Sequence, residues 1–342
     1  MSARATVVVV GFGSEEYLEQ CLSAIAVDMG PSDELILVDN GVAGAAHRRN
    51  GWPPQVRTLC PGRNLGFAGG VNLGAEAGNG IFVILVNSDA IIEPGAIDAL
   101  ISVADEARPT MATGCLRLAN APDRVNSAGN PLHYTGLCWA GGHGELATSH
   151  SLQRQVATAT GGLMALRRAV WDRLEGFNES YFAYHEDCEL SVRMWLVGGQ
   201  VVFTPHAVAL HHYNFSRNAL KMYLLERNRL ATVLTVYPTS LRRRVLPAIL
   251  LSEVGLLALA TKQGWLTQKI EGYRWLWRHR RDLRIRRELV TRTWQREPAA
   301  LTPLLSVRID PAMMQLPPLM WAVNFLLDRY WRLLGGGARA RG

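Results

Sequence analysis

The sequence predicts an α/β fold, with a doubly wound, mostly parallel sheet and a C-terminal helical extension. Two observations lead to this prediction. Over roughly the first ninety residues, short apolar runs alternate with segments of helical periodicity, which is typical of parallel strands joined by helices. Beyond about residue 216 this alternation ends and long helical segments follow. The chain has 342 residues, 48% of them hydrophobic, so it can form a large core.

Four apolar runs in the first part of the chain are expected to form strands. They span residues 6–10, 34–38, 56–59 and 81–86. Apolar residues at helical spacing predict a helix over residues 14–26, with Ser14 as its N-cap. Further helices are expected over residues 72–77 and about 94–104. This order of elements favours a parallel arrangement of the four strands.

The middle of the chain is less regular. Residues 108–160 are rich in Gly, Asn and Pro, and we expect short antiparallel strands there. A strand interrupted by two glycines is expected over residues 158–166, and a further strand over residues 200–204. Between them, a Glu–Arg pair four residues apart supports a helix over residues 186–197.

Charge divides the chain into two regions. Residues 1–215 contain 13 Lys+Arg against 21 Asp+Glu, whereas residues 216–342 contain 23 against 8. The acidic first region argues against nucleic-acid binding, and the basic second region suits anionic lipid head groups or a polyanionic acceptor. We therefore expect a nucleotide-binding and catalytic domain over residues 1–215 and a basic, Trp-rich helical region over residues 216–342.

The basic region also carries features of a membrane-surface protein. Tryptophans lie among arginines in residues 271–296 and again in residues 316–334, as in helices that lie in a membrane interface. The most apolar stretch, residues 245–260, contains Pro247 and Glu253 and is shorter than the roughly twenty residues needed to cross a bilayer. Helices that only cap the sheet are the alternative.

Cysteine usage bears on the compartment. The five cysteines are scattered and show no C-x-x-C spacing, which is typical of free thiols in a reducing compartment. The apolar run at residues 7–10 is too short for a signal peptide. We expect a cytoplasmic protein, peripheral at the inner face of the cell membrane, and a second copy of the chain is considered as a partner.

Polar residues follow the strand expected at residues 81–86. Asn87, Ser88 and Asp89 supply an amide, a hydroxyl and a carboxylate there. Ligands of open α/β sheets bind just outside the carboxyl ends of the strands, and a carboxylate with neighbouring oxygen atoms can hold Mg²⁺ or Mn²⁺. The same tripeptide is also ordinary turn chemistry.

Three further segments are expected to contact a phosphate or nucleotide. Gly11 follows the first strand, and Asp39 ends the second, where it binds a ribose or base or forms a simple Asx turn. In the glycine-rich loop that begins at Arg63, Gly66 allows close backbone approach, Asn64 can hydrogen-bond a base or ribose, and Arg63 can pair with phosphate.

Two acidic residues and two histidines are candidates for chemistry. Glu186 and Asp187 open a helix, where one carboxylate can serve as general base, although acidic residues also favour helix starts for structural reasons. His211 or His212 is a candidate metal ligand, with a hydrogen-bonded structural role as the alternative.

An ordered set of motifs resembles family-2 glycosyltransferases of the rhamnosyltransferase-like branch. The resemblance spans roughly residues 5–235. Its segments are Val38-Asp39-Asn40, Arg63 to Gly70, Asn87-Ser88-Asp89, Thr160-Gly161-Gly162, Gly176 to Glu179, Tyr181-Phe182, Glu186-Asp187 and Arg193. It implies a GT-A fold, a dTDP- or UDP-linked sugar donor (rhamnose, galactofuranose or a hexose), a divalent metal, inversion at the anomeric carbon, and a glycan or lipid-linked acceptor of cell-envelope polysaccharide synthesis.

The resemblance also implies roles for single residues. Asp89 is the main metal ligand, completed by His211 or His212, while Asp187 is the base and Glu186 supports it or orients the acceptor. Asp39, with Gly11, Arg63, Asn64, Gly66, Asn87 and Ser88, binds the donor, whereas Gly161, Gly162 and Tyr184 contact the acceptor. The segment Glu226-Arg227-Asn228 is expected near the donor diphosphate. Asn87 departs from the family, which has aspartate at that position.

Two alternative functions are considered. Gly11-Phe12-Gly13 after the first strand is compatible with a nicotinamide-dependent oxidoreductase, but Glu16 occupies the position of the third glycine and would repel a pyrophosphate. Asn87 in place of an aspartate is compatible with a non-catalytic glycan-binding relative. The two carboxylates needed for chemistry, Asp89 and Asp187, nevertheless remain.

Overall fold

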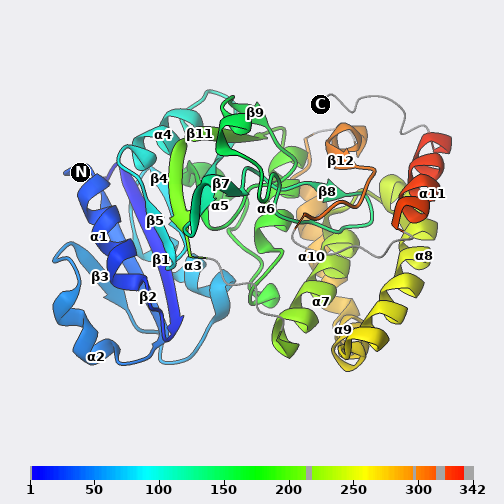
Figure 1. Ribbon diagram of the computed structural model, residues 1–342, viewed down its shortest axis with the longest axis horizontal. Helices are drawn as coiled ribbons and strands as arrows, with labels where there is room; N and C mark the ends of the chain where they lie inside the picture. The colour runs from blue at the N-terminus through cyan, green and yellow to red at the C-terminus, as the bar shows by residue number, and fades with distance from the viewer. Residues whose placement is uncertain (1, 213–217, 296–297, 313–319, 335–342) are drawn as a thin grey trace.

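The structure is a computed structural model that describes residues 2–212, 218–295, 298–312 and 320–334. A twisted central sheet with helices on both faces forms one half of the molecule, and the C-terminal helices α7 to α11 stand together at the other end (Figure 1). The α/β class and the helical extension predicted from the sequence are confirmed.

The first part of the sheet is parallel. Its strands lie in the order β3 (Val56–Leu59), β2 (Glu34–Val42), β1 (Ala5–Gly13) and β4 (Phe82–Val86). Helices α1 (Leu18–Asp28), α2 (Ala45–Arg48), α3 (Gly66–Ala77) and α4 (Ala96–Ala104) accompany them. Ser14 is not the N-cap of α1, because β1 continues to Gly13 and the helix begins at Leu18, after Tyr17. Helix α3 likewise begins six residues earlier than expected.

The second part of the sheet is mixed. Strand β10 (Leu163–Arg167) is antiparallel to both β4 and β6 (Thr110–Leu118), and β6 is parallel to β11 (Gln200–His211). The edge strand β5 (Ala90–Ile92) is antiparallel to β11. Strands β7 (Ala121–Ser127) and β9 (Arg154–Gln155) pair with β6 and β11. Helices α5 (Arg168–Arg173) and α6 (Glu186–Leu196) complete this part.

Three expectations for this part of the chain are corrected. The region 108–160 contains the nine-residue strand β6, which is buried and pairs in parallel with β11, as well as short antiparallel pieces. The interruption expected at Gly161 and Gly162 is present as a turn, but the strand expected over residues 158–166 begins only after it, at Leu163. Strand β11 extends to His211, seven residues further than predicted, and thereby carries a histidine to the sheet edge.

Two apolar layers hold the sheet between its helices. Along β1, Val7 and Val9 pack toward α1 and α4, whereas Val8 and Val10 pack toward α3 and α6. This alternation follows from the two-residue period of a strand. Helix α3 approaches the sheet closely through Gly74, where an added Cβ would lie 2.4 Å from Val8 Cγ1. Glycine therefore has a packing role within α3, in addition to its conformational role in the loop that precedes the helix.

The C-terminal region is helical, as predicted. It comprises α7 (Ala219–Val236), α8 (Thr239–Gln263), α9 (Leu266–Arg278), α10 (Arg280–Arg292) and α11 (Met320–Leu333). Strand β12 (Leu305–Ser306) pairs with β8 (Leu132–His133) and joins this region to the sheet half. The first residues of the helix predicted over 316–334 lie outside the described residues.

Helix α8 is longer than its apolar stretch suggested. It continues beyond residues 245–260 at both ends and reaches 25 residues, with Pro247 inside it. By length and composition alone, it is the one helix in the described part of the chain that could cross a membrane, and only 22% of its apolar window is buried.

A buried ion cluster ties α7, α8 and α9 together. Arg229 donates to Glu226 at 3.0 Å and also to Glu253, while Lys269 Nζ lies 2.9 Å from Glu253 and also contacts Glu226. Burial alone would raise the pKa of Glu226, but Arg229 and Lys269 lower it to about 2. Because removal of one partner would leave a buried charge unpaired, the cluster fixes how the three helices meet.

Candidate active site

The ends of β4 and β10 meet at the predicted site. Asn87 follows β4, and its backbone N–H donates to Gly162 O at 3.0 Å. The N–H of Gly161 donates to Asp187 Oδ2 at 2.9 Å. In this turn, Gly162 therefore contacts Asn87, and Gly161 contacts Asp187. The structure thus brings together two motifs that are a hundred residues apart in the chain.

Asp187 lies in the first turn of α6. Its second carboxylate oxygen, Oδ1, accepts the backbone N–H of Cys188 at 2.7 Å. Burial raises the pKa of Asp187, while hydrogen bonds from the Gly161 and Cys188 N–H groups oppose that rise. Both oxygens retain lone pairs, so this carboxylate has the oriented geometry of a general base.

Asp89 and His211 form a pair beside this turn. His211 Nε2 lies 3.1 Å from Asp89 Oδ1, and His211 Nδ1 lies 2.9 Å from Asn126 Oδ1. When the Nδ1–H donates to Asn126 Oδ1, Nε2 is directed toward the Asp89 carboxylate, where a cation held between the two would take the place of a shared proton. An outer amide that orients an imidazole in this way is a common feature of metal-binding histidines.

His212 behaves differently from His211. Its ring stacks on Tyr17 with a centroid distance of 3.6 Å, and its backbone N–H donates to Asp89 O at 2.9 Å. Successive residues of an extended segment point to opposite sides, which separates the two histidines. Only the imidazole of His211 is in hydrogen-bond contact with the Asp89 carboxylate. Within the described ranges, no cluster of three His, Cys, Asp or Glu side chains could hold a metal ion by itself.

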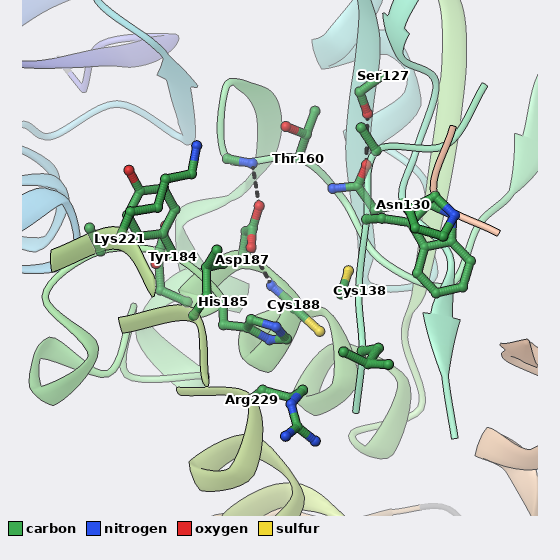
Figure 2. A pocket seen from close by; sticks show the side chains of 18 of the residues that line it. Ser127, Asn130, Cys138, Thr160, Tyr184, His185, Asp187, Cys188, Lys221 and Arg229 are labelled. Carbon is green, nitrogen blue, oxygen red and sulfur yellow. Dashed lines mark hydrogen bonds between the residues drawn. The ribbon is translucent and has the colours of Figure 1, made fainter. Parts of the chain in front are cut away.

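A cavity of about 550 Å³ extends from this edge toward the C-terminal helices. Asn87, Gly161, Gly162, Asp187 and His211 line one end of it. Figure 2 shows the Asp187 carboxylate directed toward the backbone N–H groups described above. The other end is lined by residues of α7 and α8 and by the segment before α9.

Glu186 and Tyr184 also line the cavity, on either side of His185. Burial, and then the neighbouring charge of Asp187, raise the pKa of Glu186 well above its ordinary value. Tyr184 is partly exposed, and the Nζ of Lys221 lies 5.5 Å from the centre of its ring. Both residues line the same cavity as Asp187, and Figure 2 draws them to its left.

The predicted donor residues lie mainly toward β1 and β2. Asp39 Oδ1 accepts the N–H groups of Gly41 at 3.0 Å and Val42 at 2.7 Å, which is an Asx turn, and Oδ2 lies 3.5 Å from Arg49 Nη2. Gly11 packs against Val42, whose Cγ2 would lie 2.7 Å from an added Cβ. Because β1, β2 and β4 are parallel, these residues share the sheet edge with Asn87.

The glycine-rich loop docks on the segment that precedes α6. Gly66 has a φ of +73°, and an added Cβ would lie 2.3 Å from Phe182 O. Asn64 Oδ1 accepts the Gly66 N–H at 2.8 Å, while Arg63 is exposed. A side chain at position 66 is thus excluded both by backbone conformation and by contact. Neither Arg63 nor Asn64 is among the described residues that line the cavity.

Sequence reasoning named Ser88 and Asn228 as candidates for donor contacts but missed the contacts that both make within the protein. Ser88 contacts Glu15, whose pKa is raised by burial and by the charge of Asp89, with the Ser88 hydrogen bond opposing the rise. Asn228 Nδ2 donates to the carbonyl oxygens of Tyr181, Ala183 and Tyr184 at 3.0, 2.9 and 2.7 Å. No local pattern signals either contact, because each joins segments distant in the chain.

The segment Glu226-Arg227-Asn228 was expected near the donor diphosphate. In the structure its side chains are held by contacts within the protein. All three side chains are buried. Arg227 donates to the Ser180 and Tyr181 carbonyls at 2.8 Å, and its guanidinium lies 4.5 Å from the Trp275 ring centre. These contacts hold the segment that leads into α6, and so position Glu186 and Asp187.

Comparison with known proteins places this geometry in a family. A family model described as "Glycosyltransferase like family 2" matches residues 3–232. The N-acetylglucosaminyl-diphospho-decaprenol L-rhamnosyltransferase of Mycobacterium tuberculosis is 29% identical over 233 residues, which cover 60% of this chain and 75% of that protein.

Solved structures show the same fold. The crystal structure of GalNAc-T7 with UDP, GalNAc and Mn²⁺ superposes with a TM-score of 0.56 at 15% identity, covering 70% of this chain and 49% of that one. The mannosyltransferase PcManGT from Pyrobaculum calidifontis, in complex with GDP-Man and Mn²⁺, superposes with a TM-score of 0.50 at 14% identity, covering 89% of this chain and 87% of that one. The chain thus spans about half the length of GalNAc-T7.

Proposed function

The chain belongs to glycosyltransferase-like family 2, and from this premise we propose that it is an inverting, metal-dependent transferase that moves a sugar from a nucleoside diphosphate to a lipid-linked saccharide. The observation that carries the proposal is the convergence of Asp187, His211 and Asn87 on one cavity. The rhamnosyltransferase relative, named for a diphospho-decaprenol-linked N-acetylglucosamine, supports a lipid-linked acceptor.

Asp187 is the proposed base. An acceptor hydroxyl placed against its carboxylate gives up its proton as the oxygen attacks the anomeric carbon. The new C–O bond forms on the face opposite the diphosphate, the old C–O bond breaks, and the diphosphate leaves with the bonding electrons, so the configuration inverts. The backbone N–H groups of Gly161 and Cys188 hold the carboxylate in place at 2.9 and 2.7 Å.

The Asp89–His211 pair fits a divalent cation such as Mg²⁺ or Mn²⁺. Two neighbouring ligands about 2.1 Å from such an ion lie roughly 3 Å apart, which matches the 3.1 Å between Asp89 Oδ1 and His211 Nε2. Two protein ligands leave positions for diphosphate oxygens, which is how nucleotide sites commonly hold these ions. When bound, the ion would neutralise the charge that develops on the leaving diphosphate.

The remaining donor contacts are assigned to the β1–β2 side of the edge. We place the nucleotide of a dTDP- or UDP-linked sugar near Asp39, Gly11 and the loop of Arg63, Asn64 and Gly66, with Asn87 and Ser88 beside its diphosphate. Asn87 is neutral, so in this protein Asp89 alone supplies a carboxylate from that tripeptide. His211 provides the second ligand in this assignment.

The experiment that tests the function is a transfer assay. Purified protein with Mn²⁺ is offered dTDP-rhamnose, UDP-galactofuranose or UDP-glucose, together with N-acetylglucosamine linked through diphosphate to a short isoprenoid. We expect one donor to give a lipid-linked disaccharide of inverted anomeric configuration, identified by mass spectrometry and NMR. Release of nucleoside diphosphate without a saccharide product, or a product that retains configuration, would contradict the proposal.

Helix α8 supports a location on the membrane surface. Its exposed face carries an apolar stripe with Arg243 and Arg244 at one end and Lys262 at the other. The stripe consists of Leu246, Pro247, Leu250, Leu251, Val254 and Ala258. Exposed apolar residues of α11, Trp321 and Phe325 among them, belong to the same helical end of the molecule (Figure 1). An apolar face with basic ends suits an anionic membrane interface.

Glu253 argues that α8 lies on the membrane instead of crossing it. This residue flanks the apolar stripe, three positions after Leu250, and its side chain enters the buried ion cluster with Arg229 and Lys269. Insertion across a bilayer would remove α8 from these partners and leave charges unpaired in an apolar medium. We therefore propose a cytoplasmic protein that is peripheral at the inner face of the membrane.

We predict that the double change Leu250→Glu and Leu251→Glu weakens binding to vesicles containing phosphatidylglycerol at least tenfold. The substitutions replace exposed apolar side chains by charges that anionic lipids repel. Sedimentation with vesicles measures the effect. Val27→Glu on α1, which changes an even more exposed apolar residue in the sheet half, is the control and should bind like the wild type. Equal binding of all three proteins would refute the assignment of this face.

A further inference from the structure

The floor of the cavity contains buried polar atoms that have no partner within the described part of the chain. They are His185 Nδ1, Glu186 Oε2 and Arg229 Nε. The exposed fractions of the three residues are only 8%, 5% and 1%, and all three line the cavity. Buried polar atoms of folded proteins are nearly always hydrogen-bonded, so a group of them around one cavity marks a place prepared for a polar ligand.

The backbone that leads into His185 and Glu186 is held in an unfavourable conformation. Tyr184 and His185 have φ values of 68° and 70°, which side-chain-bearing residues rarely adopt. Asn228 stabilises this conformation through the carbonyls of Ala183 and Tyr184. Strain that the surrounding contacts maintain is characteristic of binding and catalytic segments. Here it directs His185 and Glu186 to the cavity.

The charge state of these groups suits the uncharged, hydroxyl-rich sugar of a ligand. Burial, aided by the positive charge of Arg229, lowers the pKa of His185 to about 4, so its imidazole is neutral at pH 7. The raised pKa of Glu186 favours a protonated carboxyl that can donate as well as accept. Figure 2 shows the His185 ring between the Asp187 carboxylate and Arg229 in that view.

The wall of the cavity formed by α8 is apolar except for Gln263 at the end of the helix. Leu256 and Leu259 of α8, together with Trp265 and Leu137, line this part. Leu256 and Leu259 belong to the helix whose other side carries the exposed apolar stripe. A ligand that occupies the whole cavity therefore meets polar atoms on the floor and hydrocarbon on the wall, which is the requirement of an amphipathic molecule.

We propose that this part of the cavity is the acceptor subsite: His185 and Glu186 hydrogen-bond the polar substituents of the acceptor sugar, and Leu256 and Leu259 contact the apolar group attached to it. The sugar hydroxyl that reacts then lies at Asp187. This inference rests on the proposed function and specifies where its acceptor binds. It assigns to His185 a role in binding the acceptor and none in binding the nucleotide.

The test is the replacement His185→Gly. Glycine accepts the positive φ at this position without strain, so the change removes the imidazole and leaves the backbone conformation favourable. With dTDP-rhamnose, Mn²⁺ and N-acetylglucosaminyl diphosphate carrying a decyl chain, we expect the KM for the acceptor to rise at least tenfold. The KM for the donor and the rate of donor hydrolysis without acceptor should stay within twofold of the wild type.

Two further variants make the result interpretable. Glu175→Gly changes another residue of positive φ, 57°, outside the cavity lining, and should leave both KM values unchanged. His185→Asn restores a hydrogen-bonding side chain at a position that asparagine tolerates, and should recover part of the acceptor affinity. It also replaces the glycine variant should that variant fail to fold.

The apolar wall is tested separately with Leu256→Gln. This change should raise the acceptor KM at least fivefold for the decyl compound. It should leave the KM unchanged for the same N-acetylglucosaminyl diphosphate carrying a methyl group in place of the decyl chain, whereas Leu289→Gln on α10 should affect neither. An unchanged acceptor KM in His185→Gly, or an equal rise in donor KM, would overturn the proposed subsite. Failure of the proposed function would look different, because the wild-type protein itself would transfer no sugar.

Discussion

An Asp187→Asn enzyme is expected to lose sugar transfer by a factor of about 10²–10⁴ in kcat, the range typical of removing a general base. The amide has nearly the same shape as the carboxylate but cannot take a proton from the acceptor. Its single oxygen can keep only one of the two backbone contacts, with Gly161 or with Cys188. Donor binding should persist because Asp89 and His211 are untouched.

The measurement pairs steady-state transfer with a titration of UDP in the presence of Mn²⁺. Asp123→Asn, at an exposed aspartate outside the cavity lining, is the matched control and should behave like the wild type. The assignment of Asp187 fails if the Asp187→Asn enzyme turns over at more than about a tenth of the wild-type rate. Loss of UDP binding together with turnover would instead show that the substitution disturbed the fold of the site.

The pH profile adds a second readout to this prediction. Burial raises the pKa of Asp187, so the carboxylate takes up its proton at a higher pH than an exposed aspartate does. The base is active when ionised, and kcat therefore falls as pH decreases through this raised pKa. We expect that acid limb in the wild type and its absence from the residual activity of Asp187→Asn.

The first half of the fold was predictable because its signals are local. The buried runs of β1, β2 and β4 and the periodicity of α1 are set within short segments of sequence, and each forms as expected. The first and last residues of these elements depended on contacts between segments that are distant in the chain. Helix α1 starts at Leu18 and not near Ser14, since β1 keeps its pairing with β2 as far as Gly13.

The second half depended on pairing between distant segments. Strand β6 pairs in parallel with β11, some ninety residues further along the chain, and β10 inserts antiparallel between β6 and β4. Polar residues such as Thr110, Thr113 and Arg117 break the apolar pattern of β6. A pattern read within a short window therefore identified neither its length nor its partner.

The same division applies to the site. Asn87 and Asp187 stand at the ends of regular elements, where sequence position alone suggests a role. Asn228 lies in the middle of α7, and its function is visible only through the carbonyls it binds 44 to 47 residues earlier. His185 resembles an ordinary residue before a helix until its positive φ and buried, unpartnered nitrogen are known.

The second large effect is expected from Asp89→Asn. This change should reduce kcat/KM for the donor by about 10²–10³, comparable to the loss of one group that stabilises developing charge. The substitution preserves the size of the side chain but removes the negative charge that attracts the cation. Mn²⁺ binding in the presence of UDP, followed by electron paramagnetic resonance, should weaken in parallel.

A graded series tests whether the effect operates through a cation. His211→Asn removes the second ligand and should be nearly as damaging as Asp89→Asn. Asn126→Ala leaves both ligands and removes only the oxygen 2.9 Å from His211 Nδ1, so a loss of about 10–100-fold in metal affinity is expected. Val27→Ala, remote from the site, serves as the control. Unchanged Mn²⁺ binding in Asp89→Asn would refute the metal site.

The double variant Asp89→Asn with His211→Asn separates one shared site from two independent roles. If both side chains hold the same cation, either single change already removes most of its contribution, and the second change adds little. Independent structural roles would instead give losses that multiply. The contact of 3.1 Å between Asp89 Oδ1 and His211 Nε2 favours the first outcome, because groups in direct contact share their energetic consequences.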